Sequence, residues 1–522
     1  MEDQPISNIR AIFITIFVSI VIFTLGFNTT SLFDMAVPMS RQLHLSPSET
    51  QWLINSYMLT VAVLIMGGGK LCDFITRRFI FLTGCILLII SSLVVALSYD
   101  VVMLYIGRVA QGVSCALVLP ASIALIKLIV PEKLQITAFG IWSAILGVGF
   151  ASGPTIGGAL TDVISWRAGF YLIALLAFIG GIVSWVLIPK MKLERLEKFR
   201  FDWVGIVLWI LGFGSLIIGL MEAQDWGWNS PITYIVIGAG IILLIAFMVT
   251  ELLVKYPLMR PHVFVNLQLM AAIVGYLCYG FVITTLLSYL LLFLQDPLLQ
   301  HDSAMIAGAS LLPFSIAVFL FSITIEYIRK VIKSVRLLLD ISFAFIISGF
   351  AILCFIHTPS SYWFLFIPLL LVGIGFGMLQ ASLPKFAAES VTPDRMGEAT
   401  GLTWTSVYLA AVISILVLGV VYLHTWEGTF THQLASTTEP TTHLMRWAKN
   451  LQAHTYNITQ LLHRIPRNII ADVSAAYKAA SIKSMRLVMI ISTGTLIVFW
   501  LMFIALNICG YRKKCKTSAA NA

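Results

Sequence analysis

The chain has 522 residues, of which 59% are hydrophobic and only 11% are charged. A soluble globular domain carries about 25% charged residues, so this composition excludes a water-soluble protein and requires lipid as much of the solvent. The formal net charge of +9 does not indicate nucleic-acid binding, because the basic residues are distributed as a membrane topology requires.

Apolar runs long enough to cross a bilayer recur along the chain and predict fourteen transmembrane helices. The first run is too long for the core of a signal peptide, so we expect an uncleaved first helix. The predicted helices lie near residues 10–33, 51–72, 79–98, 101–125, 137–160, 168–189, 203–222, 232–254, 268–294, 303–325, 337–356, 361–384, 398–423 and 485–509.

Lysine and arginine are concentrated in alternate loops between these helices. With the N-terminus inside, 23 of them fall in short cytoplasmic segments, whereas the short outside loops hold only Arg41 and Arg167. This asymmetry predicts that both termini are cytoplasmic. One long outside segment, about 424–484, shows helical spacing of its apolar residues between Thr442 and Ile482. We expect an amphipathic helical hairpin there, and the alternative is a gate or a partner-docking element.

The first predicted helix ends in a stretch, Asn28 to Pro38, that contains the acidic residue Asp34. A carboxylate in a low-dielectric site can exchange protons near neutral pH, which is one role for Asp34. A solvated side chain at the outer end of the helix is the other, and the sequence leaves both open.

A charged cluster follows the second helix, with Gly69, Asp73, Arg77 and Arg78 in one short loop. Asp73 and Arg77 are four residues apart, close enough to pair with each other or to reach neighbouring helix ends. Such a cluster can hold two helix bundles together in one conformation and release them in another. The alternative is simple cytoplasmic charge.

The fourth helix contains Arg108 within an apolar run. Placing an arginine at the bilayer centre costs roughly 2.5–3.5 kcal/mol, so its side chain should face a polar cavity or an acidic partner. Because Arg108 lies in the outer half of the helix, extension of the side chain to the membrane surface is the alternative.

The fifth helix contains glycines at every fourth position, Gly149, Gly153 and Gly157, with Pro154 and Gly158 beside them. Glycines on one stripe let another helix approach closely, and the proline removes a backbone donor and bends the helix. A packing stripe with no role in transport is the alternative interpretation.

Together these motifs resemble the major facilitator superfamily, and more narrowly its fourteen-helix drug:proton antiporter branch (EmrB/QacA-like). Residues 147–158 are similar to the antiporter motif G-x-x-x-G-P-x-x-G-G, and residues 69–78 are similar to the superfamily's cytoplasmic loop. Residues 104–112 are similar to the motif R-x-x-q-G, whose arginine is linked to proton coupling. The usual acid of the first helix is replaced by Thr29, and we therefore expect Asp34 and Arg108 to form the protonation pair.

The resemblance implies an all-α integral membrane fold of two six-helix halves and two inserted helices. Residues 1–200 would form the N-terminal bundle, 201–262 the inserted pair, and 263–522 the C-terminal bundle. The implied function is proton-coupled export of small amphipathic or hydrophobic molecules by alternating access, with export of an endogenous metabolite such as a siderophore as the alternative. The expected location is a cell membrane, and short loops favour a bacterial inner membrane.

Other classes of function have less support in the sequence. A membrane-embedded enzyme would need a cluster of catalytic residues at membrane depth, and a sensor would need a signalling domain; neither is visible. We expect no cofactor, no metal and no nucleic acid, with protons, membrane lipid and a small-molecule substrate as partners and an accessory envelope protein left open. In the ninth helix, Tyr279, Phe281, Tyr289 and Phe293 would line a binding cavity or serve in packing.

Overall fold

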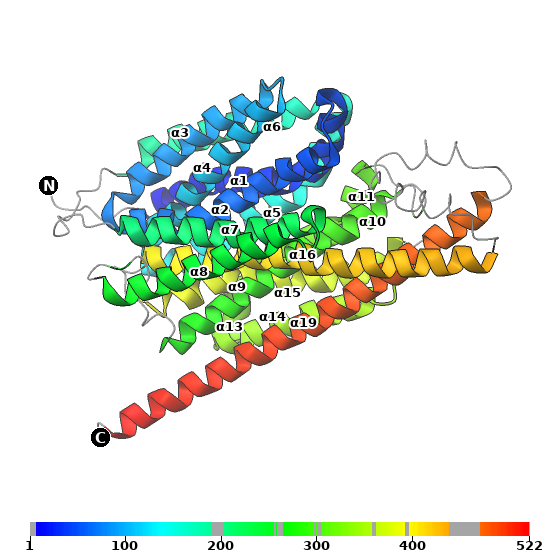
Figure 1. The fold of residues 1–522 in the computed structure, drawn as a ribbon. Coiled ribbons are helices and arrows are strands. Elements are labelled where there is room, and N and C mark those ends of the chain that lie inside the picture. The colour runs from blue at the N-terminus through cyan, green and yellow to red at the C-terminus, as the bar shows by residue number, and fades with distance from the viewer. Residues whose placement is uncertain are drawn as a thin grey trace.

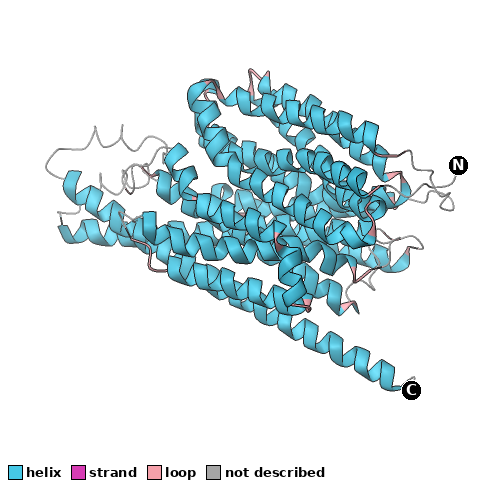
Figure 2. Cartoon of the chain, turned by 180° about the vertical axis from the view of Figure 1, so that it is seen from behind, coloured by secondary structure: helices cyan, strands magenta, loops and turns pink. Residues whose placement is uncertain are grey.

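The computed structural model describes residues 7–189, 202–254, 257, 265–296, 299, 304–357, 362–391, 396–437 and 470–520. These residues form an elongated bundle of helices, and no β-strand occurs among them (Figure 2). Thirteen of the described helices are long and apolar enough to cross a membrane, or fourteen when one bent pair is counted as a single span. The first and last helices begin and end at the same end of the bundle, as an even number of crossings requires (Figure 1).

Six long helices form the first group, and each packs on others of the same group. Several of them start at a polar residue whose side chain accepts a backbone N–H, as at Ser46, Asp100 and Ser165. The helices are α1 (Asn8–Leu43), α2 (Pro47–Phe74), α3 (Arg77–Ala96), α4 (Val101–Ile129), α5 (Gln135–Val163) and α6 (Trp166–Leu187).

A second group is formed by the helices that follow residue 265. It contains α9 (Leu267–Thr285), the π-helical segment η3 (Leu286–Leu290), α10 (Leu291–Gln295), α11 (Ala304–Ser310), α12 (Leu312–Ile323), α13 (Ile325–Val331), α14 (Val335–Leu353), α15 (Tyr362–Ala388), α16 (Met396–Thr437) and α19 (Ile470–Ala520). The two groups meet along a seam where α2 packs on α16, and α5 packs on α11, α12 and α15.

Two further helices, α7 (Trp203–Trp226) and α8 (Pro231–Leu253), pack on each other beside this seam. Helix α7 contacts both α2 and α16, so the pair covers one flank of the seam (Figure 1). At its outer end α7 is fixed to α2 by the indole of Trp52, which donates to Glu222 over 2.5 Å. Farther along, Trp209 donates to the carbonyl of Val63 in α2 over 2.9 Å.

The tenth predicted span is broken, where the sequence analysis expected one continuous helix. Its first break falls at Leu311, because Pro313 has no N–H to continue the helical bonding. The second break bends α12 against α13 by 60° at Thr324. The Thr324 hydroxyl donates to the carbonyl of Leu320 four residues earlier, a bond that competes with the backbone ladder and bends helices.

The long outside segment is partly made of helix that continues from the membrane. Helix α16 runs to Thr437 and α19 begins at Ile470, and the two extensions pack together. Trp426 of α16 donates to Ser481 of α19 over 3.0 Å, and Tyr477 donates to Asp296 at the end of α10 over 2.6 Å. The remainder of the predicted hairpin, 438–469, lies outside the described residues.

Candidate functional site

The glycine stripe of α5 lies against α1. A Cβ added at Gly149 would meet the backbone of Phe23, and one added at Gly153 would meet Thr30 and Ser31. On the opposite side of this contact, a Cβ added at Gly26 of α1 would lie 2.8 Å from the carbonyl oxygen of Leu146. The predicted motif is therefore the place where two helices of the same group come into backbone contact.

Another face of α5 meets the second group of helices. Gly140 lies against the carbonyl of Ser322 in α12, and Gly147 lies against Val318, also in α12. Pro154 is buried beside Gly308 of α11, and Gly158 is also buried. Helix α5 thus has small residues on two faces: one face packs closely on α1, and the other packs closely on helices of the second group.

Arg108 is buried, with 1% of its surface exposed, and does not reach the membrane surface. Its guanidinium donates to the side-chain oxygens of Asn28 and Gln111, each over 2.8 Å, and to the carbonyl of Leu53 over 3.3 Å. Its carbon Cζ lies 4.6 Å from the ring centre of Tyr57. No carboxylate of the described side chains lies within ion-pair distance of Arg108, so neutral oxygens and an aromatic face hold its charge.

Asp34 belongs to α1, but its side chain lies outside the described residues. Its Cα is six residues beyond Asn28, which places it about 9 Å farther along the helix and about a third of a turn around it. The residue that contacts Arg108 from α1 is Asn28, to which the sequence analysis gave no role. The sequence alone could not identify Asn28, because an asparagine that packs between helices looks the same in a sequence as any other polar residue in an apolar helix.

At the opposite end of the bundle, the last turns of α2 lie against the start of α16. A Cβ added at Gly69 would meet the backbone of Gly397 and Gly401, so α2 and α16 touch there. Arg78 donates to the carbonyl of Trp185 at the end of α6 over 2.6 Å. Arg77 is partly buried, and the side chain of Asp73 lies outside the described residues.

More contacts join the two groups at this end. The ammonium of Lys127 in α4 lies 3.3 Å from the carbonyl of Ala388 in α15. Thr137 of α5 donates to the carboxylate of Glu326 in α13, and Ser143 of α5 donates to the carbonyl of Gln380 in α15 over 3.1 Å. This end of the seam is closed in the structure.

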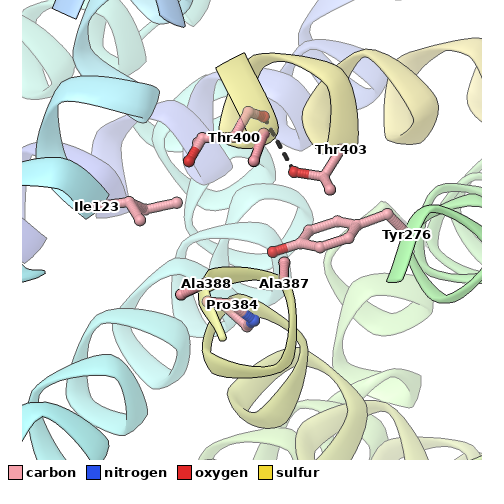
Figure 3. Close-up of a pocket in the computed structure, with 8 residues that line it drawn as sticks. Ile123, Tyr276, Pro384, Ala387, Ala388, Thr400 and Thr403 are labelled. Atoms are coloured by element: carbon pink, nitrogen blue, oxygen red, sulfur yellow. Dashed lines mark hydrogen bonds between the residues drawn. The ribbon is translucent and has the colours of Figure 1, made fainter. Parts of the chain in front are cut away.

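A small cavity of about 10 Å³ remains between the groups just inside this closure. It lies between Ile123 of α4 and residues of α9, α15 and α16, and the Tyr276 hydroxyl points into it (Figure 3). Thr403 and Thr400 line it from α16. The volume holds about one water molecule, so the seam contains no room for a substrate at this point.

Deeper in the seam, aromatic side chains from two other helices surround the indole of Trp404 in α16. The ring centre of Trp142 in α5 lies 6.1 Å from that of Trp404. The ring centres of Tyr276 and Tyr279 in α9 each lie 5.8 Å from it. Tyr279 also stacks on Phe376 of α15, with ring centres 4.7 Å apart. We call these five residues the aromatic cluster. Of the four aromatic residues suggested in the ninth helix, Tyr279 belongs to it, whereas Phe281 packs on Phe499 of α19.

A line of polar side chains leads from Arg108 to Tyr408, which lies one turn beyond Trp404 on α16. Tyr57 lies against Arg108, and the thiol of Cys115 lies between the hydroxyls of Tyr57 and Tyr408. The distance from the Cys115 sulfur to the Tyr408 oxygen is 3.6 Å. Since Tyr408 is in α16 and the other two are in α2 and α4, the line crosses the seam between the groups.

The comparisons with known proteins agree with this architecture. The sequence profile described as Major Facilitator Superfamily matches residues 16–415. The multidrug resistance protein Stp of Mycobacterium tuberculosis is 27% identical over 486 residues, which cover 90% of this chain and 87% of that protein. The tetracenomycin C resistance and export protein of Streptomyces glaucescens is 31% identical over 280 residues, which cover 53% of this chain and 51% of that protein.

Among solved structures, the human organic anion transporter MFSD10 (TETRAN) superposes with a TM-score of 0.60 at 14% sequence identity. The match covers 96% of this chain and 100% of that one, which shows a shared fold. The profile match extends over most of the chain, from the first span to the thirteenth. The chain therefore belongs to the major facilitator superfamily, as a multi-pass membrane transporter whose relatives include drug-resistance proteins.

Proposed function

We propose that this protein is a proton-coupled exporter of small amphipathic or hydrophobic molecules, working by alternating access. The observation that carries the proposal is the buried Arg108, whose guanidinium is held by neutral side chains at the contact of α1, α2 and α4. A buried cation in a membrane-spanning helix is costly to keep, and the described side chains that contact this one are neutral, which favours a functional charge over a structural one.

Two further features support the direction of transport. The glycine and proline residues of α5 match the antiporter motif, and they join the α1 contact to the seam between the two groups. Relatives with resistance and export in their names are similar over half of the chain or more. Residues 1–200, 201–262 and 263–522 would then be the first bundle, the inserted pair and the second bundle.

In the proposed orientation both termini are cytoplasmic, in the inner membrane of a bacterium. The closed end of the seam, where Gly69 meets the start of α16, would be the cytoplasmic latch, with Asp73, Arg77 and Arg78 as its charged members. Opening it separates α2 from α16 and admits substrate from the cytoplasm, and reclosing it commits the substrate to the outside. Asp34 remains our candidate for the group that takes up and releases protons, with Arg108 as its partner.

The test is proton release from acidified, inverted membrane vesicles that carry the protein and a pH-sensitive dye. Addition of a transported compound should release protons, and Arg108→Ala should reduce the rate at least tenfold. Arg41→Ala is the matched control, because Arg41 is an exposed arginine in the last turn of α1. Asp34→Asn tests the second member of the pair, and undiminished release in that variant would remove Asp34 from the mechanism.

A further inference from the structure

The aromatic cluster contains buried donors that have no acceptor. The hydroxyl of Tyr279 and the indole N–H of Trp404 make no hydrogen bond within the described part of the chain. Their side chains are only 1% and 2% exposed. A buried donor without a partner destabilises the protein, so a bound molecule that supplies acceptors to these two donors would be stabilised by them.

The cluster lies across the seam, where a moving transporter opens a site. Trp142 comes from the first group, whereas Trp404, Tyr279 and Phe376 come from the second. In the closed structure the Trp404 indole fills the centre, flanked by the other rings at distances typical of stacked and edge-to-face pairs. When the two groups of helices separate, the flat ring of a bound molecule can stack on these side chains in the way that the Trp404 indole does.

The charges near the cluster disfavour a cation. Tyr408 lies one turn beyond Trp404 on α16, and from it Cys115 and Tyr57 lead to the positive charge of Arg108. The other buried charged side chains that the structure describes are Glu251 and Glu398. Glu251 is in α8, outside the seam. Glu398 lies about 9 Å from Trp404 along the axis of α16, and its side chain already interacts with another group of the protein. No described carboxylate is placed to receive a cationic ring.

We propose that the aromatic cluster is the substrate site and that it takes flat, multi-ring aromatic molecules without a positive charge, carrying oxygen acceptors for Tyr279 and Trp404. The unpaired Oε1 of Gln380, one turn beyond Phe376, offers a place for one substrate hydroxyl. The proposal rests on the proposed function, since it names the class of molecule that the exporter would carry. Among amphipathic compounds it selects the uncharged, acceptor-bearing ones.

Binding is tested by equilibrium dialysis with the full chain in nanodiscs, using two flat compounds of similar size. 1,8-Dihydroxyanthraquinone is neutral and rich in acceptors, and ethidium is a permanent cation. The quinone should bind at least tenfold more tightly than ethidium. Tyr279→Phe keeps the ring and removes the donor, whereas Trp404→Phe keeps one aromatic ring and removes the donor together with the pyrrole ring. Each should weaken quinone binding about fivefold to tenfold, and Tyr279→Phe should leave ethidium binding unchanged.

Matched controls are available in the same chain. Trp500→Phe removes an indole donor that bonds to Asp340 over 3.1 Å, away from the seam, and Tyr289→Phe removes a hydroxyl that bonds to the carbonyl of Ile415. Both should leave quinone affinity within twofold of the wild type. Thermal unfolding in detergent verifies that each variant is folded.

Several results would overturn the assignment: tighter binding of ethidium, equal loss of both ligands in the variants, or unchanged quinone binding in both. The proton-release assay in vesicles distinguishes an incorrect substrate class from an incorrect assignment of proton-coupled export. Proton release by ethidium alone would keep the exporter and reject the substrate class. Tight, donor-dependent quinone binding without proton release would keep the substrate class and reject proton coupling.

Discussion

The contact between α1 and α5 offers a sharp prediction, because one of its close backbone approaches is made by Gly26, a glycine outside the motif. A Cβ at Gly26 would lie 2.8 Å from the oxygen of Leu146 and 2.9 Å from the nitrogen of Phe150, both backbone atoms. Ordinary contact begins at 3.4 Å, so the helices must separate by about 0.6 Å to accept Gly26→Ala. No side-chain rotation can relieve this clash.

Overpacking of this kind costs about 1–3 kcal/mol. The control is Gly494→Ala in α19, where the added Cβ meets nothing within 4 Å. In a helix interior that change is worth up to about 1 kcal/mol in favour of alanine. We therefore expect Gly26→Ala to be about 1–3 kcal/mol less stable than Gly494→Ala, measured by unfolding of the purified proteins in one detergent.

The double variant with Gly149→Ala sharpens the test. Once one alanine has separated α1 from α5, the second meets a wider gap. The double variant should therefore lose less free energy of unfolding than the two single variants lose in total. If Gly26→Ala and Gly494→Ala have the same free energy of unfolding, the close approach of α1 and α5 is not required and the packing argument for the α5 glycines is wrong.

Three other changes probe separate parts of the seam and the outer extension. Arg108→Lys keeps the charge but loses the forked donors, so we expect proton release in the vesicle assay to fall at least fivefold, and full activity would show that charge alone suffices. Thr137→Val removes a donor to Glu326, and faster hydrogen exchange at the closed end of α5 and α13 should follow; unchanged exchange would exclude this bond from the closure. Tyr477→Phe loses the bond to Asp296, and exchange should rise at the start of α19 but not in α3, whereas a uniform rise would indicate general destabilisation.

The number and order of spans could be predicted from the sequence because the bilayer imposes a length on each apolar run. The predicted helix near 101–125 corresponds to α4, Val101–Ile129, and the predicted helix near 232–254 corresponds to α8, Pro231–Leu253. The breaks in the tenth span were not predicted, because hydropathy is the same for a straight and a bent helix. Pro313 and the threonine at position 324 are local causes that average hydropathy does not register.

The candidate site was predictable only in part. Arg108 stood out because a charge in an apolar run is expensive wherever it occurs. Its partners Asn28 and Tyr57 come from α1 and α2, and their proximity depends on how three helices pack, which a single sequence does not contain. Trp404 was missed for the same reason, since an aromatic residue in an apolar helix is compatible with lipid, core or site.

The inserted pair α7 and α8 makes the two flanks of the seam unequal. Helix α7 bonds to α2 through Trp52 and Val63, so lipid is replaced by protein along that flank. On the other flank, apolar side chains such as Ile156 of α5 and Ile316 of α12 are exposed and face the hydrocarbon. The inserted pair therefore makes the molecule unequal about the junction of its two groups: protein borders the seam along α2 and α16 where α7 contacts them. A movement that separates α2 from α16 has to carry α7 with one of them or break its contacts with the other.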